Sequence, residues 1–128
     1  MPAPEAMVRA VETYVAAFDA ADPDMVVSLF APDATVEDPV GTPPHVGHAA
    51  IRTFYANSMT TGAKLKLEGP VRIAVDTAAF AFHVTFADPA MRVDVIDLFK
   101  FGEDGKVVSM KAFFGPTNMI GFGRPADA

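Results

Sequence analysis

The first half of the chain repeats its apolar residues at the spacing of amphipathic helices. Apolar side chains recur every three or four positions over residues 4–20, in a short stretch over residues 25–30, and again over residues 48–59. Asp22 followed by Pro23 is typical of a helix start, with a side-chain cap and a proline in the first turn. The pattern predicts three helices, the second of them short.

From residue 63 onward the apolar period changes to two, which is typical of strands. Strands are predicted near residues 34–38, 64–68, 71–75, 80–86, 91–101 and 108–114. Val75, Val108 and Met110 are expected in the apolar rows of their strands, and Glu103-Asp104-Gly105 is a hairpin turn signal. After Gly115 the tail is rich in glycine and proline, so loose order is expected from about residue 116.

Helices grouped before a run of strands predict an α+β fold. The strands follow one another too closely for helical crossovers, so we expect a curved antiparallel sheet. The N-terminal helices should pack on one face of this sheet, and rows of phenylalanine should line a deep apolar cavity between the two layers. Residues 1–128 are expected to form a single domain.

Composition and charge narrow the range of functions. The chain is 51% hydrophobic and 20% charged, which is typical of a globular protein. The net charge of −6 and the lack of a basic cluster argue against nucleic acid or an anionic membrane as a partner. The chain has no cysteine, which excludes disulfides, thiol catalysis and thiolate metal sites. The start has no signal-peptide pattern and no apolar stretch is long enough to span a membrane, so we expect a cytoplasmic protein.

The segment around Asp38 contains the first candidate for chemistry. Strand alternation places Asp38 on the apolar side with Val36 and turns Glu37 toward water. Pro39 restricts the backbone of Asp38 to extended angles, so the direction of the carboxylate is fixed. A carboxylate held at the edge of an apolar surface suits a general base. Asp-Pro pairs also commonly stabilise turns, and this segment alone favours that structural role.

Asp97 is the second candidate, because it occupies an apolar row between Val95 and Phe99. A buried carboxylate without a partner is very costly, so this group should keep its proton and have a raised pKa. A salt bridge is the alternative interpretation. Arg92 and Lys100 are near in sequence, but strand alternation puts both on the opposite face.

Tyr14 is the third candidate, in the middle of the apolar face of the first helix. A buried phenol needs a hydrogen-bond partner, which Tyr55 or a backbone group could supply. A tyrosine and a neutral aspartic acid are both donors, and together they could polarise a carbonyl and hold an oxyanion. Asp38 would then take the proton that leaves.

A metal site is not expected. His45 and His48 are three residues apart, but they lie on either side of the predicted helix start at Gly47 and no third ligand is evident.

Several motifs give the chain a resemblance that extends over nearly its whole length. They are Thr-Val-Glu-Asp-Pro-Val-Gly at 35–41, Ala-Ile-Arg-Thr-Phe-Tyr-Ala-Asn-Ser at 50–58, Ala-Phe-Ala-Phe at 79–82, Ile-Asp-Leu-Phe-Lys-Phe at 96–101 and Gly-Lys-Val-Val-Ser-Met at 105–110. With these motifs the chain resembles the bacterial ketosteroid isomerases of the nuclear transport factor two-like superfamily. The resemblance implies a conical barrel that binds a small-molecule steroid and forms a homodimer through its sheet.

The resemblance also implies roles for single residues. Asp38 matches the base that shuttles the proton, Tyr14 and Asp97 match the oxyanion donors, and Tyr55 matches a tyrosine that hydrogen-bonds the catalytic one. Some family members have a further tyrosine where this chain has Phe30, so the hydrogen-bond chain behind Tyr14 should be shorter. The apolar walls would be Phe54, Phe82, Phe86, Met110 and Phe114. The implied reaction moves the double bond of a 3-oxo-Δ5-steroid into conjugation with its ketone, without a metal or an organic cofactor.

Two other classes of function remain open. A non-catalytic binding module could use the same cavity for an apolar ligand. A polyketide-cyclase-like or epoxide-hydrolase-like enzyme is the other alternative. An epoxide hydrolase of this fold would require an Asp-Arg-Asp group inside, whereas strand alternation turns Arg72 and Arg92 outward.

Overall fold

The computed structural model describes residues 2–86 and 91–121. The helices are α1 (Pro4–Asp19), α2 (Pro23–Val27) and α3 (Gly47–Met59). The strands are β1 (Phe30–Glu37), β2 (His45–Val46), β3 (Lys64–Leu67), β4 (Arg72–Ala74), β5 (Thr77–Thr85), β6 (Arg92–Phe101), β7 (Val107–Phe113) and β8 (Met119–Ile120), with a short 3-10 helix η1 (Pro116–Asn118) before β8. The α+β fold and the three predicted helices are confirmed.

The helices begin and pack as their sequences predict. In α1 the residues Met7, Val11 and Tyr14 are buried along one face, because they recur every three or four positions. The Asp22 carboxylate accepts a hydrogen bond from the Met25 backbone N–H at 3.1 Å, which caps the start of α2. No helix in the described residues is long and apolar enough to cross a membrane.

The strands form one curved sheet in the order β2-β1-β7-β6-β5-β3, with β4 paired to β5 and β8 paired to β6. Most neighbours are antiparallel, as predicted, but β1 and β7 are parallel, so the sheet is mixed. The expectation of a purely antiparallel sheet rested on the short connections between consecutive strands. That argument does not apply to β1 and β7, because α3 and several strands separate them along the chain.

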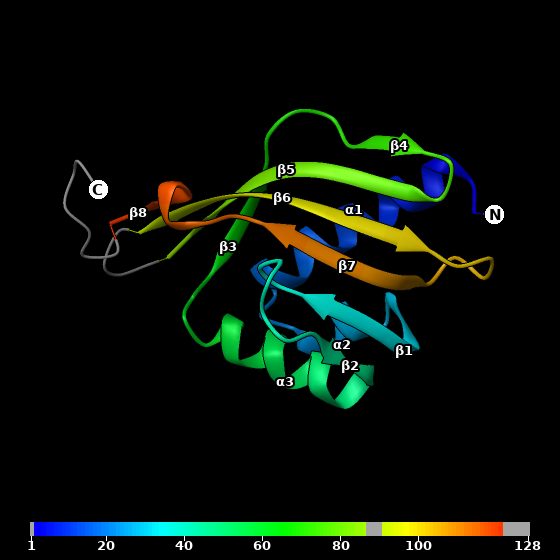
Figure 1. The fold of residues 1–128 in the computed structure, drawn as a ribbon, viewed down its shortest axis with the longest axis horizontal. Helices are drawn as coiled ribbons and strands as arrows, with labels where there is room; N and C mark the ends of the chain where they lie inside the picture. The colour runs from blue at the N-terminus through cyan, green and yellow to red at the C-terminus, as the bar shows by residue number, and fades with distance from the viewer. Residues whose placement is uncertain (1, 87–90, 122–128) are drawn as a thin grey trace.

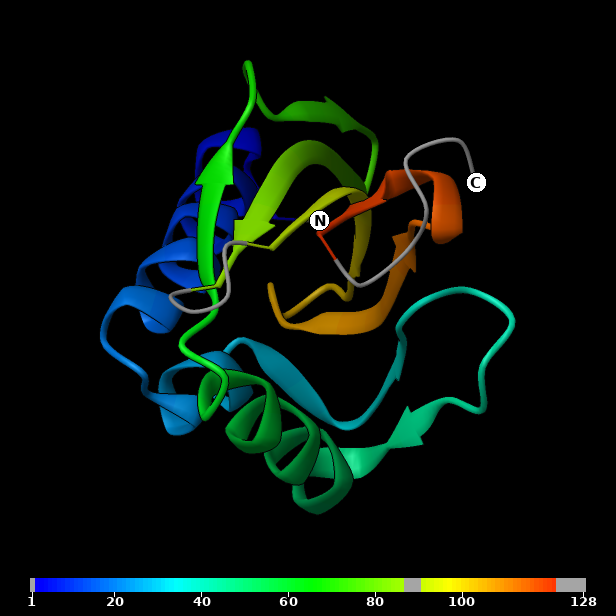
Figure 2. The same ribbon diagram turned by 90° about the vertical axis from the view of Figure 1, so that its left-hand side faces the viewer.

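The helices and the sheet form two layers, as Figures 1 and 2 show. Helix α1 contacts β3, β4 and β5, while α3 packs along β1 and α2 contacts both other helices. The strands curve strongly toward the helices in Figure 2, but β2 and β3 end the sheet without pairing to each other in the described chain. The predicted conical barrel is therefore incomplete. The sheet is curved but its two edges do not meet, and the helices cover its concave face.

Two apolar positions differ from the predicted strand rows. Val75 lies in the turn after β4 with φ of 56° and is 73% exposed, so it does not continue the apolar row. At the start of β7 the buried valine is Val107, at 0% exposure, and Val108 is only partly buried. The pairing of β6 with β7 shifts register between Lys100 and Phe101, and this shift exchanges the two valines.

More of the C-terminal tail has regular structure than predicted, and part of it pairs with the sheet. Residues 116–118 form η1, and β8 pairs with the start of β6 through Met119 and Ile120. The loose order expected from about residue 116 is therefore wrong for residues 116–120. Residues 122–128 lie outside the described residues.

Candidate active site

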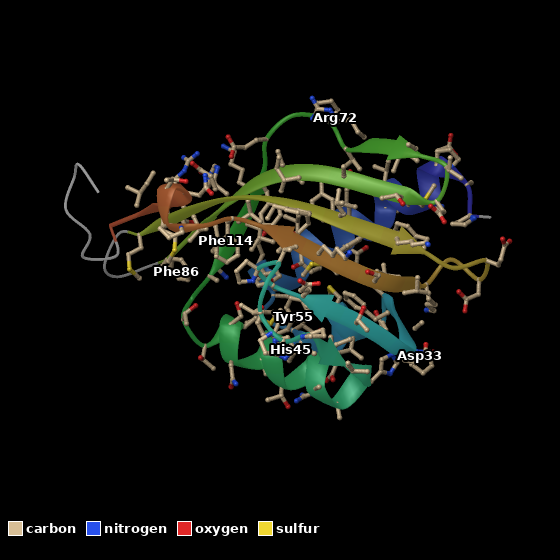
Figure 3. The ribbon with its side chains drawn as sticks, viewed as in Figure 1. Asp33, His45, Tyr55, Arg72, Phe86 and Phe114 are labelled. Carbon is tan, nitrogen blue, oxygen red and sulfur yellow. The ribbon has the colours of Figure 1, made fainter. Side chains whose placement is uncertain are left out.

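A cavity of about 230 Å³ lies between the helices and the concave face of the sheet. Its wall is mostly apolar and is formed by residues from both layers. The apolar lining residues are Phe18, Phe54, Leu65, Phe82, Val84, Phe86, Val93, Val95 and Phe114. The polar lining residues are Tyr14, Asp38, Tyr55, Ser58 and Asp97. Figure 3 shows Tyr55 on α3 and Phe86 and Phe114 toward the end of the sheet.

The structure places four of the five predicted wall residues on this cavity. Phe54, Phe82, Phe86 and Phe114 line it, but Met110 does not have that position. Met110 is 0% exposed in the hydrophobic core, where it pairs with Val36 on one side and Phe99 on the other. The resemblance implied a wall position for Met110, and the structure corrects it, because the Met110 side chain is packed in the core and is not among the described lining residues.

Asp38 follows directly after β1 and lines the cavity. Val36, two residues before it, is completely buried, as alternation predicts. Glu37 turns away, and its carboxylate accepts a hydrogen bond from the Gly41 backbone N–H at 2.8 Å on the surface. Burial raises the pKa of Asp38 to about 6, so this carboxyl changes its charge close to neutral pH.

Asp97 is only 1% exposed, which confirms its predicted place in the apolar row of β6. Among the described residues, neither of its carboxyl oxygens has a hydrogen-bond partner. Burial raises the pKa of Asp97 well above its usual value, and the charge of Asp38 raises it further. The salt-bridge alternative is wrong for Arg92, whose guanidinium lies 2.7 Å from the Asp94 carboxylate on the other face. Burial therefore favours the protonated form of Asp97, which can donate a hydrogen bond into the cavity.

Tyr14 is 2% exposed, and its hydroxyl lies 3.1 Å from the hydroxyl of Tyr55. The rings of Phe18, Phe80 and Phe99 contact the Tyr14 ring edge to face, which fixes its position. Burial raises the pKa of Tyr14 well above its usual value, and the Tyr55 hydroxyl adds to the effect. Tyr14 therefore stays protonated and can donate a hydrogen bond into the cavity.

The hydrogen-bond chain behind Tyr14 is short. Tyr55 packs against Phe30 at a ring-centroid distance of 6.3 Å, and Phe30 has no hydroxyl with which to extend the chain. Burial also raises the pKa of Tyr55 well above its usual value. The hydrogen bond between Tyr14 and Tyr55 is thus not continued at Phe30.

The two histidines considered for a metal site have other contacts. His48 Nε2 lies 2.8 Å from the Phe30 carbonyl oxygen, and the His45 ring packs on the Phe54 ring at 4.4 Å. In residues 2–86 and 91–121, no group of three or more histidine, aspartate or glutamate side chains is placed to hold a metal ion.

The sequence analysis did not assign a role to Ser58, the fifth polar residue of the cavity. Ser58 lies one helical turn after Phe54 on the same side of α3. That spacing was the available signal, because any residue four positions after a cavity-lining residue in a helix lies beside it.

The cavity thus combines groups with different protonation behaviour. Asp38 can be ionised near neutral pH, whereas Asp97 and Tyr14 keep their protons. This set can remove a proton from a bound molecule and donate two hydrogen bonds to the negative charge that forms.

The raised pKa of Asp97 gives a prediction about stability. The folded protein binds more protons than the unfolded chain between the unfolded pKa, about 4, and the higher folded pKa. The free energy of unfolding should therefore fall as pH rises through this window. Asp97→Asn carries no titratable proton, so it should be less sensitive to pH and more stable than wild type near neutral pH.

Urea unfolding at several pH values measures this difference. Asp33→Asn, at an exposed position, is the matched control because it removes one carboxylate from the surface. Equal pH dependence for wild type and Asp97→Asn would mean that Asp97 is not a neutral acid in the folded protein.

Comparisons with known proteins agree with the fold and the cavity. Residues 11–110 match the SnoaL-like domain family. The steroid Delta-isomerase of Nocardioides simplex is 41% identical over 114 residues, which cover 87% of this chain and 91% of that protein. Epoxide hydrolase LasB of Streptomyces lasalocidi is 31% identical over 134 residues, which cover 98% of this chain but 47% of that protein.

A solved structure extends the comparison. The epoxide hydrolase/cyclase-like enzyme SalBIII, described for its role in pyran ring formation in the polyether salinomycin, has a TM-score of 0.85 and 27% identity to this chain. The similarity covers 93% of this chain and 98% of that one. The domain match shows that the chain belongs to the SnoaL-like domain family. Together with the isomerase relative, it shows that the chain is a member of the ketosteroid isomerases in the nuclear transport factor two-like superfamily, and therefore an enzyme of the isomerase class.

Proposed function

We propose that the enzyme converts 3-oxo-Δ5-steroids into 3-oxo-Δ4-steroids through a dienolate. The observation that carries the proposal is the pairing of an ionisable carboxyl, Asp38, with two neutral buried donors, Tyr14 and Asp97, on one apolar cavity. The 41% identity to a steroid Delta-isomerase supports a steroid as the substrate class.

The proposed reaction moves one proton and one double bond. The Asp38 carboxylate removes a proton from the carbon between the ketone and the double bond. The electron pair of that C–H bond then forms a new carbon–carbon double bond, and the carbonyl electrons move to oxygen. Tyr14 and Asp97 donate hydrogen bonds to this oxyanion. Asp38 returns the proton to the far carbon of the original double bond, the ketone re-forms, and the product is conjugated.

The state of Asp97 supports this role. A buried polar group without a partner costs free energy, about 1–3 kcal/mol for a typical neutral group. The carbonyl oxygen of a substrate would accept a hydrogen bond from the protonated Asp97 carboxyl and so give this group a partner. The stronger negative charge of the dienolate would be held more tightly than the ketone, which favours the transition state over the bound substrate.

The alternatives account for fewer features of the cavity. The similarity to LasB and SalBIII favours an epoxide hydrolase as the second candidate. That chemistry would require an arginine beside the carboxyls, whereas no arginine is among the described lining residues. Arg72 Nη1 donates instead to the Pro70 carbonyl at 3.0 Å on the surface. A binding module without catalysis would have no use for a neutral carboxyl buried at the cavity.

The proposal includes a homodimer formed through the outer face of the sheet. Ile96 and Phe113 are cross-strand neighbours on that face and are 49% and 45% exposed, and Val40 beside them is 43% exposed. Large apolar side chains gathered on one surface favour contact with another protein surface. A second copy of the chain would cover this patch.

The function is tested by mixing the purified protein with 5-androstene-3,17-dione and following the ultraviolet absorbance of the conjugated enone. Rapid isomerisation is expected without added metal, nucleotide or flavin, because the ketone of the substrate receives the electrons. The same assay in the presence of a chelator is the control. A rate no higher than buffer alone, or a rate abolished by the chelator, would contradict the proposal.

The pKa of Asp38 predicts the pH profile of this reaction. The base must be ionised to accept a proton, and burial raises its pKa to about 6. Therefore kcat/KM should fall about tenfold per pH unit below that value and level off above it. Steady-state rates measured from about pH 5 to about pH 8 test this, and a flat profile over that range would contradict Asp38 as the base.

A further inference from the structure

The internal cavity is small for the substrate class proposed above, on which this inference rests. It holds about 230 Å³. Sites that bury most of a drug-sized ligand usually hold ~300–1,000 Å³. A rigid four-ring molecule with its ketone at Tyr14 and Asp97 must therefore extend beyond the cavity at its other end.

A second hollow lies beside the cavity, along the exposed side of α3. Its lining residues are His45, Ala50, Thr53, Phe54, Asn57 and Ser58. Phe54 and Ser58 also line the cavity, so the two spaces meet at these side chains. Helical spacing explains this arrangement, because positions 54 and 58 form a stripe between the buried face of α3 and its exposed face.

The wall of this hollow is more polar than the wall of the cavity, although Ala50 and Phe54 contribute apolar surface to it. Its wall carries an amide, two hydroxyls and an imidazole, and it has no carboxylate among the described lining residues. The Thr53 hydroxyl is already bonded to the Ala49 carbonyl of the same helix. The side chains of Asn57 and Ser58 make no hydrogen bond to the rest of the described chain, so both can bind a ligand.

The Phe54 ring lies at the boundary between the cavity and the α3 hollow. It packs on the His45 ring at 4.4 Å and on the Tyr55 ring at 5.1 Å. These contacts on both sides give the ring a fixed position, so that an apolar ligand surface can pass over it from the cavity to the hollow.

A third hollow, on the outer face of the sheet, shares Phe82, Val95 and Phe114 with the cavity. Phe82 and Val95 belong to neighbouring central strands and are only 3% and 7% exposed. The sheet therefore separates this hollow from the cavity, and the α3 hollow is the better continuation.

We propose that Asn57 and Ser58 form a polar subsite that binds the far end of the substrate, at an oxygen-bearing group such as a hydroxyl or a ketone. The apolar rings fill the cavity, and the far oxygen lies in the α3 hollow. The amide of Asn57 and the hydroxyl of Ser58 can each donate or accept, so the subsite takes neutral hydrogen-bonding groups. It makes the enzyme selective for steroids that carry oxygen at both ends.

Equilibrium binding tests the subsite without depending on turnover. Estradiol and its 17-deoxy analogue share a phenol that mimics the dienolate, and they differ only in the far hydroxyl. Calorimetry with wild type should show estradiol binding ~3–10-fold tighter, the effect of one neutral hydrogen bond. Asn57→Ala, Ser58→Ala and the double variant should reduce this ratio toward one and leave the affinity for the deoxy analogue unchanged.

Asn118→Ala is the matched control, because it removes the same amide from the hollow on the outer face of the sheet. Its affinity ratio should equal that of wild type. A ratio that survives in the double variant, an equal loss for both ligands in the α3 variants, or a ratio abolished by Asn118→Ala would each overturn the subsite. So would failure to bind either steroid, which would also overturn the proposed substrate class. Discrimination between the ligands without any isomerase activity would contradict the proposed function and leave the subsite supported.

Discussion

Asp38→Asn should lower the turnover of 3-oxo-Δ5-steroids by ~10²–10⁴-fold, the usual loss when a general base is removed. The amide has nearly the shape of the carboxyl but cannot accept the proton that the reaction transfers. Affinity for a phenolic steroid should remain close to that of wild type, because the donors Tyr14 and Asp97 are intact. Steady-state kinetics and calorimetry on the same preparation separate the two effects.

The neighbouring residue is the control for this prediction. Glu37 follows Val36 on the opposite side of β1, and its carboxylate is bonded to the Gly41 backbone on the surface. Glu37→Gln should have nearly the wild-type rate. Damage from Glu37→Gln together with a mild effect of Asp38→Asn would show that the wrong carboxyl had been assigned as the base.

Tyr14→Phe should lower kcat by ~10²–10³-fold, as the loss of one oxyanion donor does in other enzymes. The phenyl ring keeps the edge contacts with Phe18 and Phe99, so the fold should be little affected. The lost hydrogen bond is stronger to the dienolate than to the ketone, and KM should therefore change much less than kcat. Kinetics with denaturant unfolding of the same variant measure both.

Tyr55→Phe is the matched control for this change. It removes a hydroxyl 3.1 Å from that of Tyr14 but no donor to the substrate, so its rate should fall less than that of Tyr14→Phe. A Tyr14→Phe variant with a rate near wild type would give Tyr14 a structural role only.

Local patterns in the sequence were sufficient to predict much of the cavity. The period of two in β6 put Asp97 among apolar residues, and the structure confirms its burial at 1% exposure. The helical period put Tyr14 and Tyr55 on inward faces, and the structure brings their hydroxyls together. These predictions succeed because side-chain direction follows directly from the repeat of a helix or strand.

Features that depend on contacts between distant segments were not predicted. The parallel pairing of β1 with β7 joins strands that are far apart along the chain, and no local pattern encodes it. The register shift near Phe101, which buries Val107 in place of Val108, depends on how two strands meet. Met110 was misplaced and Ser58 was left without a role for the same reason, because the depth and extent of a cavity follow from packing.

Asp38 is expected to carry one proton between two carbons of the same substrate inside the mostly apolar cavity. The direct measurement uses a substrate with deuterium on the carbon between the ketone and the double bond, in ordinary water. Asp38 should deliver a substantial part of the label to the far carbon of the original double bond, as mass spectrometry and NMR of the product would show. A product without deuterium at that far carbon would contradict the transfer of the proton by Asp38.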